Sequence, residues 1–324
     1  MKKIIILTLL LGFMFSCTNS DPKKSTAKEE SVSINSFPTI SVNKGPDALF
    51  LTPDKQFLYV ANVEDTTISV INTFSEKVTL SINGVHYPWG FVRLGESNQI
   101  AVSAYDKQVV IIDFTTHQKI KEQSFENHLG GITANKDGSL LYVISIDENR
   151  VLQLEGTTLE TLKTFSTGKA PDGIGISKDD NSLFVTNTED GTISVININN
   201  GEQRLIHTGG KPELVHPNHD HSLLFISNFY GNKIHVMETK KGEIIHEIEN
   251  VKSPEEAVPS PDEKRLYVVS FDNSEVYVYN TATYEKLSEV YKTGSKPIGV
   301  IPLDNKLFVS NYGDNSVSVI PLKN

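Results

Sequence analysis

The sequence has almost no cysteine, and this scarcity removes several kinds of chemistry. Cys17 is the only cysteine among 324 residues. One thiol cannot form a disulfide within the chain, and it cannot build a Cys-paired zinc site, a CxxC redox motif or a c-type haem attachment site. Positive charge is also in deficit, because 40 Asp and Glu outnumber 30 Lys and Arg. A net charge of −10 argues against a nucleic-acid partner, whose phosphates require clustered Lys and Arg.

Long hydrophobic runs are scarce as well, and the one that stands out lies at the N-terminus. It extends from Ile4 to Phe15 behind the basic pair Lys2-Lys3, and it is too short for the ~30 Å hydrocarbon core of a bilayer. We therefore interpret residues 1–16 as a signal peptide. A signal peptide followed by an incidental cysteine is one reading of Cys17. The other follows from Ser16-Cys17, which resembles a bacterial lipobox and implies that Cys17 is lipidated.

A polar segment follows the cysteine. Residues 18–30 read TNSDPKKSTAKEE and contain no hydrophobic side chain larger than Ala. Such a segment cannot bury enough apolar surface to offset the entropy of ordering it. The sequence thus predicts a lipidated Cys17 and flexible tether over residues 17–30, followed by a folded domain over residues 31–324.

Within that domain the sequence repeats itself seven times. Each copy contains an apolar segment such as LYVAN, and successive copies are spaced by 42, 41, 42, 41, 42 and 41 residues. The segments begin at Leu58, Ile100, Leu141, Leu183, Leu224, Leu266 and Leu307. A period of about 40–45 residues with strand-like units is typical of a β-propeller. We therefore predict an all-β fold, a seven-bladed propeller of four-stranded blades.

The seventh copy ends before its fourth strand, which raises the question of how the ring closes. The segment Thr39–Val42 precedes Pro46 as Leu80–Ile82 precedes Pro88. Ile40 and its counterparts in most other copies lie six residues before the next proline. We predict that this N-terminal strand completes the last blade and removes an open sheet edge.

The repeats also resemble a known family. The segments TPDKQFLYVANVEDTTISVINT (52–73) and DDNSLFVTNTEDGTISVINI (179–198) are similar to YVTN-type seven-bladed propellers, and the similarity covers residues 39–324. The resemblance implies that ligands sit on the face formed by the inter-blade loops and the turns between second and third strands. It does not specify a function, because propellers host both enzymes and binding scaffolds.

The repeat register places two groups of candidate residues on that face. One residue after the proline position stand four carboxylates and a tryptophan: Asp47, Asp172, Glu213, Glu255 and Trp89. At or beside the second-to-third-strand turns and an inter-blade loop stand aromatic residues: Tyr105, His128, Phe229, Tyr230, Phe271 and Tyr312. The carboxylates would make an acidic funnel for a cation, or accept backbone hydrogen bonds between blades. The aromatic side chains would contact a ligand or partner, or they would pack between blades. Trp89 would contact a ligand or partner, pack between blades as core, or plug the channel.

The sequence carries no recognisable catalytic motif. GxSxG, HExxH and GxxxxGK[ST] are all lacking, and we assign no catalytic residue, metal or cofactor. The only dense histidine cluster is His216, His219 and His221. The repeat register puts the last two on a turn at the opposite face, so a solvated turn is expected there and a weak metal site is the alternative.

These observations favour a lipid-anchored binding or scaffold protein of the bacterial envelope, on the periplasmic or surface side of the outer membrane. Its expected partner is a small molecule or a protein held on the inter-blade-loop face. Some propeller lipoproteins that it resembles act beside outer-membrane transporters in nutrient capture, so an outer-membrane receptor is one candidate partner. We expect a monomer that touches the membrane through its anchor only. The alternative function is a lactonase-like hydrolase, since sugar-lactone hydrolases share this propeller style.

Overall fold

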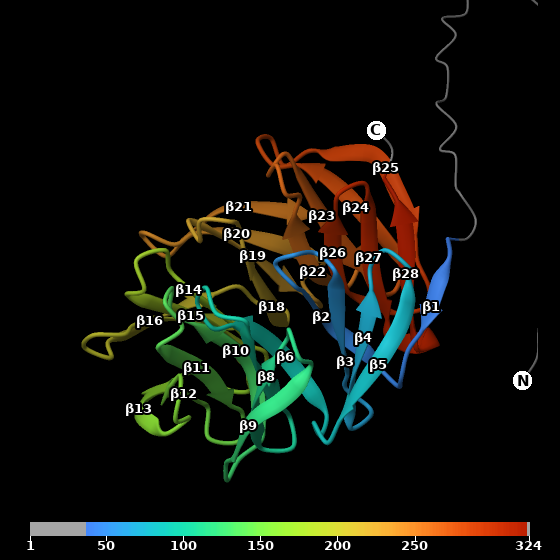
Figure 1. Cartoon of the computed structure of the whole chain (residues 1–324). Coiled ribbons are helices and arrows are strands. Elements are labelled where there is room, and N and C mark those ends of the chain that lie inside the picture. Colours follow the sequence, from blue (N-terminus) through green and yellow to red (C-terminus); the bar gives the residue numbers. More distant parts are fainter. Residues whose placement is uncertain (1–36, 323–324) are drawn as a thin grey trace, which may run out of the picture. The chain divides into compact units, whose positions relative to one another are not determined.

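The computed structural model describes residues 37–322. In every blade the innermost strand begins at the repeat position that proline usually fills. Proline has no N–H to donate, so the first residue of a strand is one of the few sheet positions that tolerate it. The strands form seven antiparallel sheets of four, arranged as a ring (Figure 1). The predicted all-β seven-bladed propeller is confirmed. The predicted signal peptide, Cys17 and tether lie outside the described residues.

The strands follow the chain blade by blade. Blade 1 contains β2 (Pro46–Leu51), β3 (Phe57–Asn62), β4 (Thr67–Asn72) and β5 (Lys77–Asn83). Blade 2 contains β6 (Pro88–Arg93), β7 (Gln99–Ala104), β8 (Gln108–Asp113) and β9 (Gln118–Ser124). Blade 3 contains β10 (Leu129–Ala134), β11 (Leu140–Ser145), β12 (Arg150–Glu155) and β13 (Thr161–Ser166). Blade 4 contains β14 (Pro171–Ile176), β15 (Ser182–Asn187), β16 (Thr192–Asn197) and β17 (Gln203–His207).

The remaining blades continue the pattern. Blade 5 contains β18 (Pro212–Pro217), β19 (Leu223–Asn228), β20 (Lys233–Glu238) and β21 (Glu243–Glu249). Blade 6 contains β22 (Pro254–Pro259), β23 (Arg265–Ser270), β24 (Glu275–Asn280) and β25 (Lys286–Lys292). Blade 7 contains β26 (Pro297–Leu303), β27 (Lys306–Asn311), β28 (Ser316–Pro321) and β1 (Thr39–Ser41), with the 3₁₀ turn η1 (Tyr312–Asp314) between β27 and β28. In this part of the chain no helix has the length and apolar character needed to cross a membrane.

The last blade is closed by the N-terminal strand, as predicted. β1 pairs antiparallel with β28, and Thr39, Ile40 and Ser41 lie opposite Ser318, Val317 and Ser316. Backbone hydrogen bonds from Val319 N to Pro38 O (2.8 Å) and from Val42 N to Asn315 O (3.0 Å) extend the pairing at both ends. Ile40 is 8% exposed and packs with residues of blades 1 and 7. The two ends of the propeller are therefore held together by one sheet.

The hydrophobic core is divided among the seven interfaces between neighbouring blades, each of which holds its own cluster of buried side chains. The aromatic residue of the LYVAN-type segment supplies much of this packing: Tyr59, Tyr142, Phe184, Tyr267 and Phe308 are at most 2% exposed. Burying a side chain of this size contributes about 1.5–3 kcal/mol. The repeat therefore encodes the contact of each blade with the next.

Buried asparagines at the ends of several second strands shape the loops of the inter-blade face. Asn187 Nδ2 donates to Thr192 Oγ1 and Ser194 Oγ at 2.9 Å each, while its Oδ1 accepts from Gly168 N at 3.0 Å. Asn311 makes the equivalent bonds in blade 7. The amide group thus hydrogen-bonds both to the third strand, which follows the turn, and to the loop that enters the same blade. These bonds fix where the inner strand begins.

Candidate functional site

The inner strands of all seven blades line a central cavity of about 510 Å³. Its end on the inter-blade-loop side is lined by the residues that directly follow the strand starts, and we call this ring the mouth: Asp47, Trp89, Asp172, Glu213 and Glu255. The pairing register of each inner strand shifts within its first four residues, for example between Pro46 and Leu49. Such a bulge re-aims side chains and is common beside functional sites. The structure thus brings all five predicted residues to one opening.

The acidic residues of the mouth are crowded enough to change their own protonation. Burial and the nearby carboxylates of Asp172, Glu256 and Glu213 raise the pKa of Asp47 to about 8. Burial raises the pKa of Glu255 well above its usual value, and the charges of Glu213, Asp47 and Asp172 add to this effect. A charged carboxylate is disfavoured when water is removed or when a like charge is near. Part of the ring therefore carries protons at neutral pH, although each group is a potential negative charge.

One lysine partly balances this charge. Lys211 Nζ forms an ion pair with Glu213 Oε1. Burial raises the pKa values of Glu213 and Asp172, while the positive charge of Lys211 opposes that rise in both. Asn228 Oδ1 accepts a hydrogen bond from Lys211 N at 2.8 Å, so the buried asparagine of blade 5 positions this lysine. A single ammonium against four carboxyl groups leaves the mouth able to accept further positive charge.

Trp89 of blade 2 contacts Asp172 of blade 4 at this opening. Its indole donates a hydrogen bond to Asp172, which lowers the pKa of that carboxyl and so opposes the effect of burial. The ring is half-buried and lines the cavity. It is neither a fully buried core residue nor a freely exposed one, and it presents an aromatic wall beside carboxylates. That combination suits organic cations, which aromatic rings attract through their electron-rich faces.

The mouth carboxyls do not tie blades together through backbone hydrogen bonds. Within residues 37–322, none of Asp47, Asp172, Glu213 and Glu255 accepts a hydrogen bond from a backbone N–H. That role falls to the neighbouring Glu256, whose Oε2 accepts from Val300 N of blade 7 at 2.8 Å. The sequence analysis missed Glu256 because alternation along a strand would turn it away from the channel. The bulge of β22 lets both glutamates line the cavity.

The aromatic residues form two separate groups beside the mouth. In blades 2 and 3, the Tyr105 ring lies 5.8 Å from Trp89 and stacks on His128 at 4.5 Å. His128 Nδ1 lies 2.8 Å from Asp147 Oδ2, so a carboxylate orients the imidazole. The structure places Tyr105 and His128 next to Trp89, and Asp147 is a partner that the repeat pattern did not indicate.

The second aromatic group lies in blades 5 and 6. The ring of Phe229 is 5.4 Å from Tyr230 and 5.7 Å from Phe271. Lys211 Nζ is 5.8 Å from the centroids of both Phe229 and Tyr230, and Tyr230 is 71% exposed. Tyr312 stands apart from both groups, since its hydroxyl donates to Glu64 Oε1 and its pKa is raised to about 12, chiefly by that hydrogen bond.

The histidine cluster does not converge. His219 and His221 belong to the turn between β18 and β19, at the end away from the mouth. His219 Nδ1 is 3.6 Å from Glu263 Oε1, whereas His216 Nδ1 is 3.1 Å from Glu256 Oε1 inside the cavity. Within residues 37–322, no group of three or more His, Cys, Asp and Glu side chains is arranged to hold a metal ion. His216 therefore belongs with the central cavity, a placement that its sequence neighbours did not indicate.

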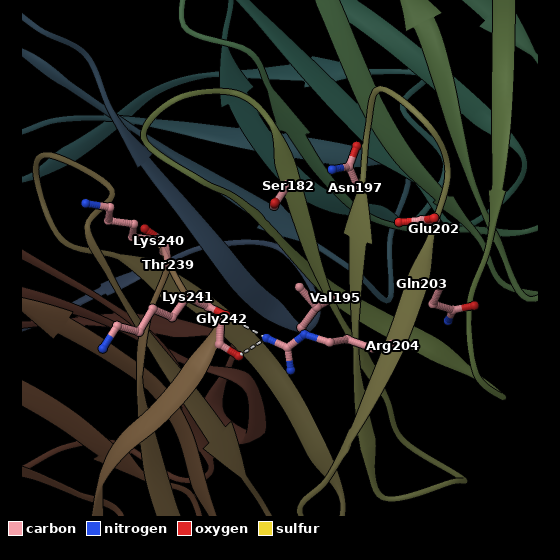
Figure 2. Close-up of a pocket in the computed structure, with 10 residues that line it drawn as sticks. All are labelled: Ser182, Val195, Asn197, Glu202, Gln203, Arg204, Thr239, Lys240, Lys241 and Gly242. Atoms are coloured by element: carbon pink, nitrogen blue, oxygen red, sulfur yellow. Dashed lines mark hydrogen bonds between the residues drawn. The ribbon is translucent and has the colours of Figure 1, made fainter.

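A different hollow, of about 450 Å³, lies between blades 4 and 5 on the opposite face (Figure 2). Arg204 Nη2 donates to the carbonyl oxygens of Lys241 and Gly242 at 2.7 and 2.6 Å. Figure 2 shows the ammonium ends of Lys240 and Lys241 extending away from Arg204. The guanidinium that lines this hollow is already hydrogen-bonded to backbone carbonyls, and the two lysine ammonium groups point away from it. The central cavity is therefore the better candidate site.

A family model matches part of this chain. The model described as "Lactonase, 7-bladed beta-propeller" covers residues 91–219, which is less than half of the sequence. No curated protein sequence matches the chain.

Among solved structures, the chain is similar to hydrazine synthase from Kuenenia stuttgartiensis, with a TM-score of 0.74, 19% identity, and coverage of 86% of this chain and 96% of that one. Streptogramin B lyase gives a TM-score of 0.75 at 14% identity, covering 89% and 97%. The Cps50 (Swd1) propeller domain of Myceliophteria thermophila gives 0.74 at 11%, covering 88% and 100%. At these identities the likenesses show the propeller fold alone.

Proposed function

We propose that the propeller is a binding protein that admits a positively charged ligand into the mouth of its central cavity. The observation that carries this proposal is the ring itself. Four carboxyl groups and the only tryptophan of the chain line one opening, with one lysine to balance them. A concave site with a few convergent polar groups is the usual form of a small-molecule site. An acidic opening also raises the local concentration of cations and disfavours anions.

The surroundings of the mouth support a binding role. Two aromatic groups, around Tyr105 and around Phe229, flank the opening on blades 2–3 and 5–6. Large rigid side chains of this kind dominate many binding surfaces. They provide contact area for a ligand or a protein partner that extends beyond the cavity.

The cellular setting follows from the N-terminal sequence, which lies outside the described residues. A signal peptide over residues 1–16 and a lipidated Cys17 would tether the propeller to the bacterial envelope. A tethered, cation-accepting cavity suits nutrient capture beside an outer-membrane receptor, which would take over the bound compound.

The test is a thermal-shift panel on residues 31–324, with tryptophan emission as a second readout. Choline, hexylammonium and L-lysinamide represent cations, glucose a neutral compound and citrate an anion. We expect at least one cation to raise Tm and to change Trp89 emission, and we expect Glu213→Gln to weaken that effect about tenfold. Glu202→Gln, which neutralises an exposed carboxylate of the other hollow, should leave it unchanged. Binding of citrate or glucose without binding of any cation would contradict the proposal.

Lactone hydrolysis is the second candidate function, and the family model over residues 91–219 favours it. His216 is held by the Glu256 carboxylate inside the cavity, the arrangement that a general base requires. An anionic lactone would meet the acidic mouth, so a neutral lactone such as gluconolactone is the appropriate substrate. Turnover above the buffer rate that disappears in His216→Asn would favour the enzyme, and loss of that turnover on chelation with recovery on adding Ca²⁺ would show a need for calcium.

A further inference from the structure

The central cavity continues beyond the mouth along the inner strands. Its lining includes every residue of β18 from Glu213 to Pro217, and His221 of the following turn. A six-residue strand is about 17 Å long. The cavity therefore follows most of the length of an inner strand, which suits a ligand with an extended chain.

The wall of the cavity changes character below the mouth. Three residues after the strand starts, apolar side chains line the cavity: Leu49, Phe91, Ile132, Ile174 and Val215. Apolar surface favours the burial of hydrocarbon. The cavity is therefore acidic at its opening and apolar at these five wall positions, while the His216–Glu256 pair forms a polar part of the wall.

The far end of the cavity carries a guanidinium in place of the carboxyl groups of the mouth. Arg93 lines the cavity there, and its guanidinium donates to Ser97 O at 2.9 Å and to Glu96 O at 2.8 Å and forms an ion pair with Glu96 Oε2 at 3.4 Å. The carboxyl groups of the mouth, with a single lysine among them, are therefore the stronger attraction for the positive end of a ligand.

Glu213 supplies a feature that the acidic ring alone lacks. Glu213 is 8% exposed and lines the cavity, and among the described residues its buried Oε2 has no hydrogen-bond partner while Oε1 is held by Lys211. A buried acceptor without a donor is unfavourable, so a donor arriving in the mouth would stabilise the complex. Within the described residues the carboxylates do not converge as metal ligands, and the arriving donor is therefore an organic cation.

We infer that the central cavity binds a slender organic ammonium compound, with its ammonium group in the mouth beside Glu213 and Trp89 and its apolar chain along the inner strands. This inference rests on the proposed function and specifies its ligand class. A polyamine or the lysine side chain of a peptide shares the ammonium chemistry, but its carbon chain leads to another charged or polar group instead of ending in hydrocarbon.

Protons take part in this binding, because a cation and the protons of the mouth compete for the same carboxyl groups. Asp47 has a pKa of about 8, so it is mostly protonated at pH 7 and gives up its proton when a positive charge arrives. The charged and titratable groups that face it and its neighbour Glu255 are Asp172, Glu213, Glu256, Lys211 and Tyr312. Affinity for the ammonium compound should therefore rise with pH between about 6 and 9.

The experiment is isothermal titration calorimetry of residues 31–324 with probes that differ in one feature at a time. Hexylammonium is compared with hexanol and hexanoate for the head group, and with methylammonium for the chain. We expect hexylammonium to bind at least tenfold more tightly than each of the other three. Repeating the titration at pH 7 in buffers of different ionisation enthalpy should show release of about one proton per molecule bound. Asp47→Asn should abolish most of that release, and Glu202→Gln should preserve it.

The outcomes separate this inference from the proposed function. If methylammonium, 1,6-hexanediamine or a trilysine peptide binds as well as hexylammonium, the mouth takes cations but the apolar chain plays no part, and the inference is wrong while the proposed function stands. Tight binding of Ca²⁺ in place of hexylammonium would also overturn it. If no cation binds at all, the proposed function fails with it.

Discussion

At the scale of single residues, Trp89 reports the electrostatic character of the mouth, since no other tryptophan contributes to emission. Its indole lies beside Asp172 and near the other carboxyls of the ring. Above about pH 8, where Asp47 has lost its proton, the opening concentrates cations and depletes anions within about a Debye length, ~10 Å at 0.1 M salt. Small charged quenchers therefore sample this potential directly.

We predict that caesium quenches Trp89 more efficiently than iodide does, when each is normalised to its effect on N-acetyltryptophanamide. Stern–Volmer titrations at pH 9 and low ionic strength measure both. The ratio of the caesium quenching constant to the iodide quenching constant should fall by about twofold or more in Glu213→Gln, which removes one charge of the ring. The same ratio should stay constant in the matched variant Glu202→Gln. Iodide quenching equal to or stronger than caesium quenching would show that the mouth carries no negative potential.

Asp47 makes a prediction about stability and pH. Its folded-state pKa is raised from 3.8 to about 8 by burial and neighbouring carboxylates, so the folded state holds a proton that the unfolded state releases. Stability contributed by this group is present below about pH 4 and is lost as pH rises toward 8. Asp47→Asn should therefore be more stable than the unaltered protein at pH 9, by at least about 2 °C in Tm, with a smaller difference at pH 5. Thermal melts at the two pH values check this prediction. If Asp47→Asn melts below the unaltered protein at pH 9, the folded state stabilises the charged carboxylate and the prediction is wrong.

At the scale of secondary-structure elements, β1 is the shortest strand of the ring and yet closes it. Ile40 is buried between blades 1 and 7, whereas Thr39 beside it is exposed. We predict that Ile40→Ala lowers stability by about 2 kcal/mol and that Thr39→Ala leaves it nearly unchanged. Deleting residues 18–43 should lower Tm further, because it exposes the edge of β28, while deleting residues 18–30 should not. Equal melting temperatures for the two truncations would contradict closure by β1.

The elements also show what the sequence could and could not predict. The 41–42-residue period, the prolines and the six-residue offset of Ile40 predicted the blades and the closing strand, because each blade packs on the next through the same few positions. The cavity lining was predicted in part, since the residue after each strand start faces the channel. Glu256 was missed because it reaches the channel only through a bulge. The pairing of Trp89 with Asp172 was missed because it joins two blades that are not adjacent along the chain.

Lys211 and His216 show the same limit for side chains. Lys211 lies beside Glu213 because Asn228 fixes its backbone, and His216 is drawn to the cavity by Glu256 on the next blade. Neither contact leaves a periodic signal, since each depends on one substitution in one blade. Local patterns predict which positions share a face, and contacts that depend on one residue of one blade have to be seen in three dimensions.

At the scale of the whole molecule, the proposed anchoring depends on one thiol. Cys17→Ala should abolish incorporation of a fatty-acid analogue during metabolic labelling, because the chain has no second cysteine to carry the lipid. Ser16→Ala, which keeps a small residue before Cys17, should retain the label. Label on the Cys17→Ala protein would contradict the lipoprotein assignment.

The central claim is that a compound with an ammonium head and a slender apolar chain enters the cavity from its acidic end. The most direct measurement is anomalous diffraction from crystals of residues 31–324 soaked with 6-bromohexylammonium, whose bromine marks the far end of the chain. We predict one dominant bromine peak inside the central cavity, below the mouth and among Leu49, Ile132 and Val215, with the ammonium group next to Glu213. A bromine peak at the mouth, in the hollow beside Arg204, or only on the outer surface would contradict the account.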